Sequence, residues 1–270
     1  MTTVRSDAWP EASEPVLQVA GPLATITLNR PGHRNRLQNE DLQALLRHFE
    51  AVQDQTAVRV LVLRARAGAA PEAGVPVFSA GYHLGQFQGG HAGGDLAFAH
   101  VPDALARLRV VTVCALSGSV YGGATDLAMA CDFRIGVQGM VLRMPAAALG
   151  LHYYPSGLRR FVARIGLGAA RRLFLRADAV AADDLLAMGY LDELVPPAQL
   201  DDAVDALAGR LVQMAPLALQ GMKQTLQEIA WGEARGEEWR AREVLTQASA
   251  DFAEGRAAFA ERRPPRFIGR

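Results

Sequence analysis

The sequence predicts an α/β fold built around a largely parallel sheet. Apolar, β-branched runs such as Val58–Leu63 and Val110–Leu116 alternate with segments of helical spacing, which is the pattern of strand–helix–strand units. Half of the 270 residues are apolar, so the chain can bury the large core that such a fold requires. From about residue 200 onward the periodicity is helical alone, and this change marks the candidate boundary in the chain.

The first elements follow a polar tail, residues 1–13. Two alternating runs, Val16–Ala20 and Leu23–Leu28, flank the turn dipeptide Gly21-Pro22 and predict a hairpin. Asn39 is placed to cap a helix with an acidic first turn. That helix is indicated by apolar residues at helical spacing, namely Leu42, Leu45, Leu46, Phe49 and Val52.

Later elements are shorter, until the helical C-terminal part. Leu96–Leu108 is helical in composition, and Pro102 should kink that helix or mark its true start. After residue 200 we expect helices near 200–214, 217–231, 236–253 and 255–262. The short strands and helices in between are expected at Phe133–Val137, Val141–Met144, Leu158–Ile165, Ala169–Leu175, Asp183–Met188 and Tyr190–Val195.

Charge and composition narrow the class of protein. Lys and Arg together number 28, as do Asp and Glu, and a net charge of zero gives no support for nucleic-acid binding. The N-terminus has no apolar signal-peptide core, and no run approaches the ~20 apolar residues of a membrane span. Cys114 and Cys131 lie in apolar surroundings and are expected to be buried thiols, not a disulfide. We therefore expect a cytoplasmic protein with no nucleic-acid or membrane partner.

The most informative stretch runs from Val110 to Cys131. Its strand stops at Ser117-Gly118, and Gly122-Gly123 then open an apolar helix that carries one acid, Asp126. A helix that starts on glycines directs free backbone N–H groups at one point, with the positive end of the helix dipole behind them. Phosphate loops of the P-loop type need Gly-Lys-Ser/Thr, which this stretch lacks. Stabilising the negative oxygen of an enolate or tetrahedral intermediate is therefore the leading interpretation.

Five motifs, in order along residues 14–270, resemble the crotonase (enoyl-CoA hydratase/isomerase) superfamily. Each motif is weak alone, and their common order makes the resemblance specific. They are Asn29-Arg30-Pro31 with Arg34-Asn35 and Leu37; Phe78-Ser79-Ala80-Gly81-Tyr82-His83-Leu84; Gly118 with Gly122-Gly123, Asp126-Leu127-Ala128 and Cys131-Asp132; Gly157-Leu158-Arg159-Arg160; and Phe252–Phe259 with Arg263–Phe267.

The resemblance implies a spiral core of ββα units over residues 14–199. It implies a C-terminal all-helical region, residues 200–270, that mediates a homotrimer or a dimer of trimers. The implied substrate is an acyl-CoA, with coenzyme A entering as part of the substrate and no further cofactor or metal.

The resemblance also assigns site residues. The thioester oxygen is expected between two backbone N–H groups, those of Tyr82 and Gly123, which form an oxyanion hole. Arg34 is a candidate ligand for the CoA phosphates, although a solvated surface charge is an equal interpretation. The other expected substrate contacts are Ala80, Gly81, Tyr82, His83, Leu84 and Gly122.

Two positions depart from the family pattern. Family hydratases carry two glutamates, and this chain has Asp126 at the first position and Ala146, after Pro145, at the second. Asp126 lies at i+3 from Gly123, one turn along the same helical face, whereas the alanine can do no proton chemistry. His83 replaces the aspartate of the family's A-G-x-D. With one carboxylate, double-bond isomerisation or another single-base reaction is easier to explain than hydration.

A second polar cluster, His152, Tyr153 and Tyr154, lies where some relatives place an acid, base or nucleophile. These side chains could protonate an enolate or hold a polar acyl tail, or they could fill core space.

Three alternative functions are consistent with these residues. The first is a hydratase/isomerase-type enzyme in which Asp126 moves the proton. The second is an acyl-CoA decarboxylase, thioester hydrolase or C–C hydrolase that uses His152 or Tyr154. The third is a non-catalytic acyl-CoA-binding protein.

Overall fold

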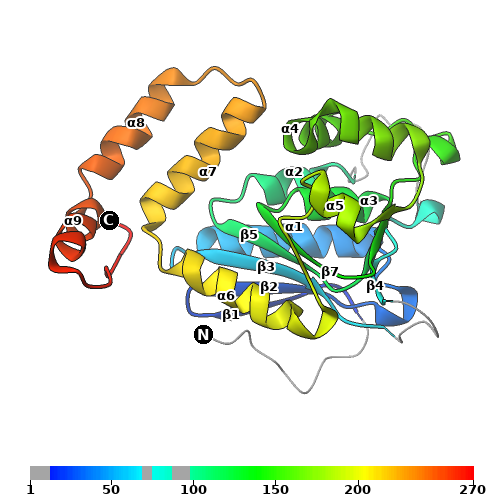
Figure 1. Ribbon diagram of the computed structural model, residues 1–270, viewed down its shortest axis with the longest axis horizontal. Coiled ribbons are helices and arrows are strands. Elements are labelled where there is room, and N and C mark those ends of the chain that lie inside the picture. The colour runs from blue at the N-terminus through cyan, green and yellow to red at the C-terminus, as the bar shows by residue number, and fades with distance from the viewer. Residues whose placement is uncertain (1–12, 69–74, 87–97) are drawn as a thin grey trace.

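The computed structural model describes residues 13–68, 75–86 and 98–270, and its core is a six-stranded sheet (Figure 1). β1 and β2 form the expected antiparallel hairpin, and every other neighbouring pair in this sheet is parallel. The prediction of a largely parallel sheet is therefore confirmed. In spatial order the strands are β1 (Val16–Ala20), β2 (Leu23–Leu28), β3 (Val60–Ala65), β5 (Val111–Leu116), β7 (Phe133–Val137) and β10 (Glu193–Val195).

The strands of a second, four-stranded sheet alternate along the chain with those of the first. Gly118 connects β5 of the large sheet to β6 of the small one. A Cβ at Gly118 would lie 1.8 Å from the carbonyl oxygen of Pro76, so only glycine fits this crossing. In order the strands are β4 (Val77–Ser79), β6 (Ser119–Tyr121), β8 (Val141–Arg143) and β9 (Val180–Ala181), with only the β8–β9 pair antiparallel.

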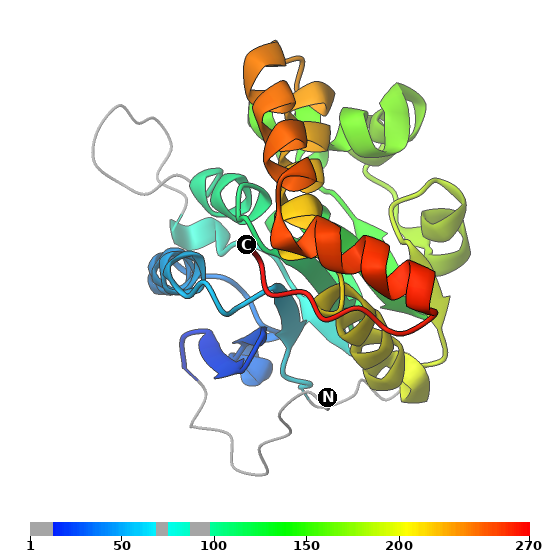
Figure 2. The same ribbon diagram turned by 90° about the vertical axis from the view of Figure 1, so that its left-hand side faces the viewer.

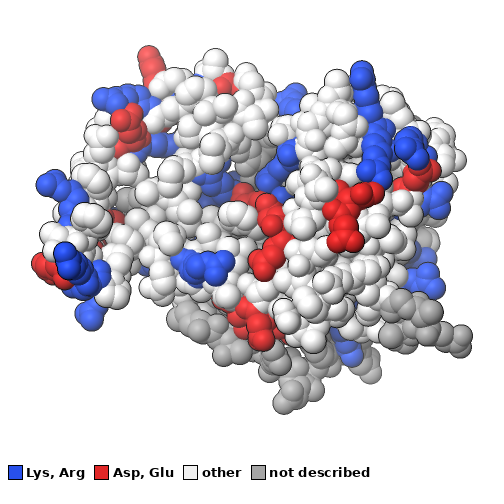
Figure 3. All heavy atoms as spheres, viewed as in Figure 1, with Lys and Arg blue, Asp and Glu red and all other residues white. Residues whose placement is uncertain are grey.

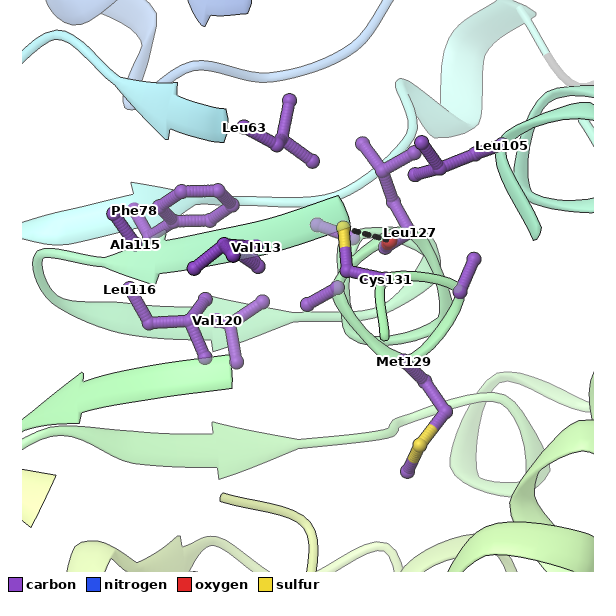
Figure 4. Close-up of a cluster of buried hydrophobic side chains, with 14 of the residues drawn as sticks. Leu63, Phe78, Leu105, Val113, Ala115, Leu116, Val120, Leu127, Met129 and Cys131 are labelled. Atoms are coloured by element: carbon purple, nitrogen blue, oxygen red, sulfur yellow. Dashed lines mark hydrogen bonds between the residues drawn. The ribbon is translucent and has the colours of Figure 1, made fainter. Parts of the chain in front are cut away.

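The core fills the space between the sheets and helix α3 (Gly123–Met129). Figure 4 shows side chains of β3, β4, β5 and β6 converging with Leu127 and Cys131 at the end of this helix. Burying each large aliphatic side chain stabilises the fold by roughly 1.5–3 kcal/mol. Cys114 and Cys131 are both buried and free, as expected. This packing anchors α3, and with it the glycines at its start.

Further helices pack on the large sheet, on the small sheet or on one another. Their bounds are α1 (Asn39–Asp54), α2 (His100–Ala106), α4 (Pro155–Arg171), α5 (Ala182–Ala187) and α6 (Leu200–Val212). Pro102 lies in the first turn of α2, so it marks the start of that helix and does not kink it. The cap of α1 is Gln38 and not Asn39, because the Asp41 carboxylate reaches back to the Gln38 N–H at 2.9 Å.

The two helices expected at Leu158–Ile165 and Ala169–Leu175 both form, with a kink at Gly166 between them. α4 continues through Gly166, which adopts a φ of 75° and interrupts the helical geometry, and a π-helical turn then spans Arg172–Arg176.

Among the described residues, no helix is long and apolar enough to cross a membrane, and no cluster of His, Cys, Asp or Glu is arranged to hold a metal ion. Of the expected tail, only Ser13 is described, and residues 1–12 lie outside the described part of the chain.

The C-terminal helices project to one side of the sheet (Figures 1 and 2). They are α7 (Pro216–Ala230), α8 (Gly236–Gln247) and α9 (Ala250–Glu261). The expected helix at 236–253 is wrong at its end, because the Ser249 hydroxyl accepts a hydrogen bond from the Phe252 N–H (3.0 Å) and caps a new helix. Acidic and basic side chains are interspersed over the face drawn in Figure 3, in keeping with the zero net charge.

Candidate active site

Two glycine turns meet where the parallel strands β4 and β6 end. Gly81 has a φ of 84° and Gly122 a φ of 51°, conformations that a side chain would strain. A Cβ at Gly81 would lie 2.5 Å from the Tyr121 carbonyl oxygen and 3.2 Å from the Gly123 nitrogen. The close approach brings together the backbone segments that carry Tyr82 and Gly123, the two expected oxyanion donors. Since Gly123 is the first residue of α3, its N–H has no acceptor within that helix.

The Asn29–Leu37 motif braces the first of these turns. Leu37 pairs with Tyr82 in an isolated parallel bridge, in which the Leu37 N–H donates to the Gly81 carbonyl and the His83 N–H to the Leu37 carbonyl, both at 2.9 Å. The Arg34 carbonyl accepts the Ala80 N–H at 2.9 Å, and the Arg34 side chain is exposed. The structure thus assigns the Arg34 backbone a bracing role and leaves its side chain at the surface.

Asp126 is fully buried and held by two side chains. Arg160 of α4 donates to its carboxylate from Nε at 2.8 Å and from Nη2 at 3.4 Å, and the Tyr154 hydroxyl donates to Oδ2. The Tyr153 hydroxyl in turn donates to Tyr154 at 3.1 Å, and Arg160 Nη2 also binds Asp103 of α2 at 2.7 Å. The network therefore joins α2, α3 and α4 at one carboxylate.

Burial governs the electrostatics of this network. A buried carboxylate is costly unless it is paired, and the guanidinium of Arg160, itself 3% exposed, supplies the opposite charge. Burial acts to lower the pKa of Arg160, but the Asp126 and Asp103 carboxylates raise it overall, so Arg160 stays charged. Burial, followed by the charge of Asp126, raises the pKa of Tyr154 well above its usual value. Tyr154 therefore keeps its proton at neutral pH and acts as a donor.

Gly157 provides the space for this network. A Cβ there would lie 2.6 Å from the Tyr153 ring, 2.7 Å from the Tyr154 ring and 2.9 Å from Asp126 Oδ2. A side chain at position 157 would thus displace the group that donates to Asp126.

The remaining predicted site residues differ in their exposure and in their contacts. His152 is exposed, and it has no part in the hydrogen bonds given above for Asp126. Leu84 and Ala80 are exposed, whereas His83 is half-buried beside Gly85. The Tyr82 hydroxyl donates to the Asn39 side chain at the start of α1. Ala146, at the position of the second family glutamate, is buried in the apolar core.

Sequence reasoning missed two members of the site. Arg160 was recognised as part of a motif but not as the partner of Asp126, and Asp103 was not considered. A cation at the sixth residue of a helix and an acid 34 residues earlier carry no local sign of pairing. One feature of the sequence does indicate that Asp126 has a cationic partner, because a lone acid in an apolar helix needs a counter-charge.

The fold and these turns define an α/β protein with a glycine-lined site at the start of a buried helix. A family model for enoyl-CoA hydratase/isomerase matches residues 19–270. The chain belongs to the enoyl-CoA hydratase/isomerase family.

Individual relatives agree over nearly the whole length. The 2,3-dehydroadipyl-CoA hydratase of Escherichia coli is 29% identical over 254 residues, which are 91% of this chain and 94% of the relative. The crotonyl-CoA hydratase of Syntrophomonas wolfei is 28% identical and covers 94% of this chain and 98% of its own. A solved enoyl-CoA hydratase/carnitine racemase from Magnetospirillum magneticum superposes with a TM-score of 0.85 at 25% identity, covering 96% of each chain. The expected crotonase-type fold is thereby confirmed.

Proposed function

We propose that this protein is an acyl-CoA enzyme that forms a thioester enolate, with one carboxylate, Asp126, exchanging the proton. The observation that carries the proposal is the buried Asp126 carboxylate, one helical turn after Gly123 and bound by a protonated tyrosine. The names of the relatives, which act on enoyl-CoA thioesters, support the same substrate class.

The enolate oxygen is stabilised by the backbone N–H groups of Tyr82 and Gly123. Each preorganised donor in a dry site contributes about 3–4 kcal/mol toward a developing oxyanion. The close packing of Gly81 on the Gly123 nitrogen supports this geometry, because it sets the two segments at a distance that side chains would not permit. The dipole of α3 adds to the stabilisation.

The proton moves between the acyl carbon and Asp126. The ionised carboxylate accepts the proton removed from the substrate, and Arg160 keeps its charge paired in the resting enzyme. Tyr154 donates to Asp126 and accepts from Tyr153, so its hydroxyl can carry the proton between substrate and carboxylate. One such group is enough to take a proton from one carbon and return it to another.

Ala146 favours isomerisation or another single-base reaction over hydration. Hydration requires one proton to be taken from water as it attacks and another to be delivered to the α-carbon, and in this family two glutamates share that work. A methyl group at position 146 cannot bind or polarise water. Double-bond isomerisation needs no water at all.

The test uses acyl-CoAs of different unsaturation in heavy water, with the acyl protons followed by NMR. Wild type should exchange or migrate α- or γ-protons, and Asp126→Asn should reduce that rate by about 10²–10⁴-fold, because it removes the acid–base group. Tyr154→Phe should reduce the rate more than Tyr153→Phe, a matched control whose hydroxyl binds Tyr154 and not Asp126. Full activity of Asp126→Asn would overturn the role of Asp126, and new β-hydroxyl signals would show hydration instead.

Decarboxylation, thioester hydrolysis and C–C cleavage form the second candidate class. The hydrogen-bonded hydroxyl of Tyr154, with His152 two residues earlier, supports it. Normal turnover of acyl-CoA substrates in these reactions by a His152→Ala, Tyr154→Phe double variant would remove this candidate. Tight binding of CoA with no turnover of any acyl chain would favour the third candidate, a non-catalytic binding protein.

We propose a homotrimer or a dimer of trimers in the cytoplasm, and the C-terminal helices support the assembly. They leave large apolar side chains in water, with Leu226 67% exposed and Phe259 89% exposed. Such side chains gather where a partner surface covers them. Sedimentation of the purified protein should give three or six times the monomer mass, and a stable monomer would contradict this assembly.

A further inference from the structure

Phe98, the second residue before α2, lies directly on the glycine that opens α3. Ring atoms Cζ, Cε1 and Cε2 of Phe98 lie 2.7, 2.9 and 3.2 Å from the position that a Cβ on Gly123 would occupy. Glycine at this position therefore serves the ring as well as the backbone turn, because any side chain would overlap it.

The same ring is in contact with the two tyrosines of the site. Its centroid lies 5.6 Å from that of Tyr82 and 6.2 Å from that of Tyr154, with tilted planes. Tilted aromatic pairs at these separations are attractive. Phe98 therefore stands between the residue after the Gly81 turn and the tyrosine that binds Asp126, with Gly123 beneath it.

This position limits the space for an acyl chain. A thioester oxygen held by the Tyr82 and Gly123 N–H groups places the acyl carbons next to Gly123, and these carbons must also approach the Asp126–Tyr154 pair. Phe98 lies between Gly123 and the Asp126–Tyr154 pair, in the space that the acyl carbons would use. A short acyl group fits beside the ring, whereas a longer chain competes with it for the same volume, and packed aromatic rings tolerate such overlap poorly.

We propose that Phe98 is a specificity-determining residue that restricts the enzyme to short acyl chains. The proposal rests on the proposed function, because it takes the oxyanion position from it. Phe98 was not among the residues that the sequence pointed to, since it belongs to none of the five motifs.

The test compares kcat/KM for 3-enoyl-CoAs of four, eight and twelve carbons, the substrates of double-bond isomerisation, in wild type, Phe98→Leu and Phe98→Ala. Wild type should prefer the four-carbon chain. Phe98→Ala should raise the twelve-to-four ratio of kcat/KM at least about tenfold, with Phe98→Leu in between, since gaining room for methylenes changes discrimination by such factors. Phe252→Ala, on the exposed side of α9, is the control and should leave the ratio unchanged.

Binding separates failure of this inference from failure of the proposed function. Calorimetry with saturated butyryl- and dodecanoyl-CoA should show tighter relative binding of the long chain in Phe98→Ala. If both saturated thioesters bind and the enoyl-CoAs are turned over but the ratio does not move in either Phe98 variant, the ring is not the restriction. If no acyl-CoA binds to wild type, the proposed function itself is wrong. Melting curves confirm that both variants are folded.

Discussion

Two arginine–carboxylate pairs in this molecule share the same chemistry and differ in their surroundings. Asp126 and Arg160 lie in the core between α3 and α4, 0% and 3% exposed. Glu228 and Arg242 join α7 to α8 near the surface, with side chains 9% and 20% exposed. Glu228 also accepts hydrogen bonds from Trp239 and Gln224, at 2.8 and 3.1 Å, whereas within the described part of the chain Asp126 accepts from a tyrosine hydroxyl besides its arginine.

The difference in surroundings indicates the role of each ion pair. A buried ion pair loses hydration that its own attraction barely replaces, so it is weak evidence of a stabilising role. The α7–α8 pair connects two helices that are also joined by hydrogen bonds from Trp239 to Glu228 and from Arg242 to Thr225. The core pair instead sets a carboxylate beside the glycine turn and a tyrosine, where an apolar pair would pack more cheaply. The position of the core pair is explained by chemistry at the site, and that of Glu228 and Arg242 by the packing of α7 on α8.

The largest expected contrast comes from removing each arginine. Arg160→Met leaves Asp126 buried without a counter-charge and should lower the free energy of unfolding by about 3–5 kcal/mol. Arg242→Met, the matched control, should cost about 1 kcal/mol, because Glu228 keeps other donors and lies near water. Urea denaturation of both variants measures the two values. Equal losses would mean that the two pairs are energetically alike.

A smaller effect is expected from Gly157→Ala. The added methyl would overlap the Tyr153 and Tyr154 rings and the Asp126 carboxylate, and overpacking of this kind costs about 1–3 kcal/mol. Because the Tyr154 hydroxyl is displaced, turnover should fall as well. Gly168→Ala, in the same helix with nothing within 4 Å of the added methyl, should leave activity unchanged and stability unchanged or raised. If Gly157→Ala is as active as Gly168→Ala, Tyr154 is not needed in its observed place.

The smallest effect is the pH dependence of the α7–α8 pair. Hydrogen bonds from Arg242 lower the pKa of Glu228 to about 2, from 4.5. A lowered folded-state pKa means that the stabilisation is complete above about pH 4.5 and is lost as the pH falls toward 2. We expect about 1 kcal/mol, because solvent screens a pair this close to the surface. Unfolding free energies of wild type and Glu228→Gln should converge across this window, and a constant gap would contradict the shift.

Much of the fold followed from local pattern. The run Val110–Leu116 predicted strand β5 within one residue, because a buried parallel strand reads as a continuous apolar run. Gly122-Gly123 predicted the turn into α3, because that backbone geometry excludes side chains. Ends of helices were less certain. The Gln38 cap of α1 and the break at Ser249 depend on single hydrogen bonds that composition does not reveal.

What the sequence alone determined was the position of most strands of the large sheet, the glycine turns, the lone acid Asp126 and the missing glutamate at position 146. These features depend on residue identity and on spacing between residues close in the sequence, and both can be read directly from the sequence. Only the tertiary structure decided that Arg160 neutralises Asp126 and that Phe98 covers Gly123. Both contacts join elements that meet through packing of whole helices, and the energy of a contact between distant residues depends on burial and distance, which no local pattern contains.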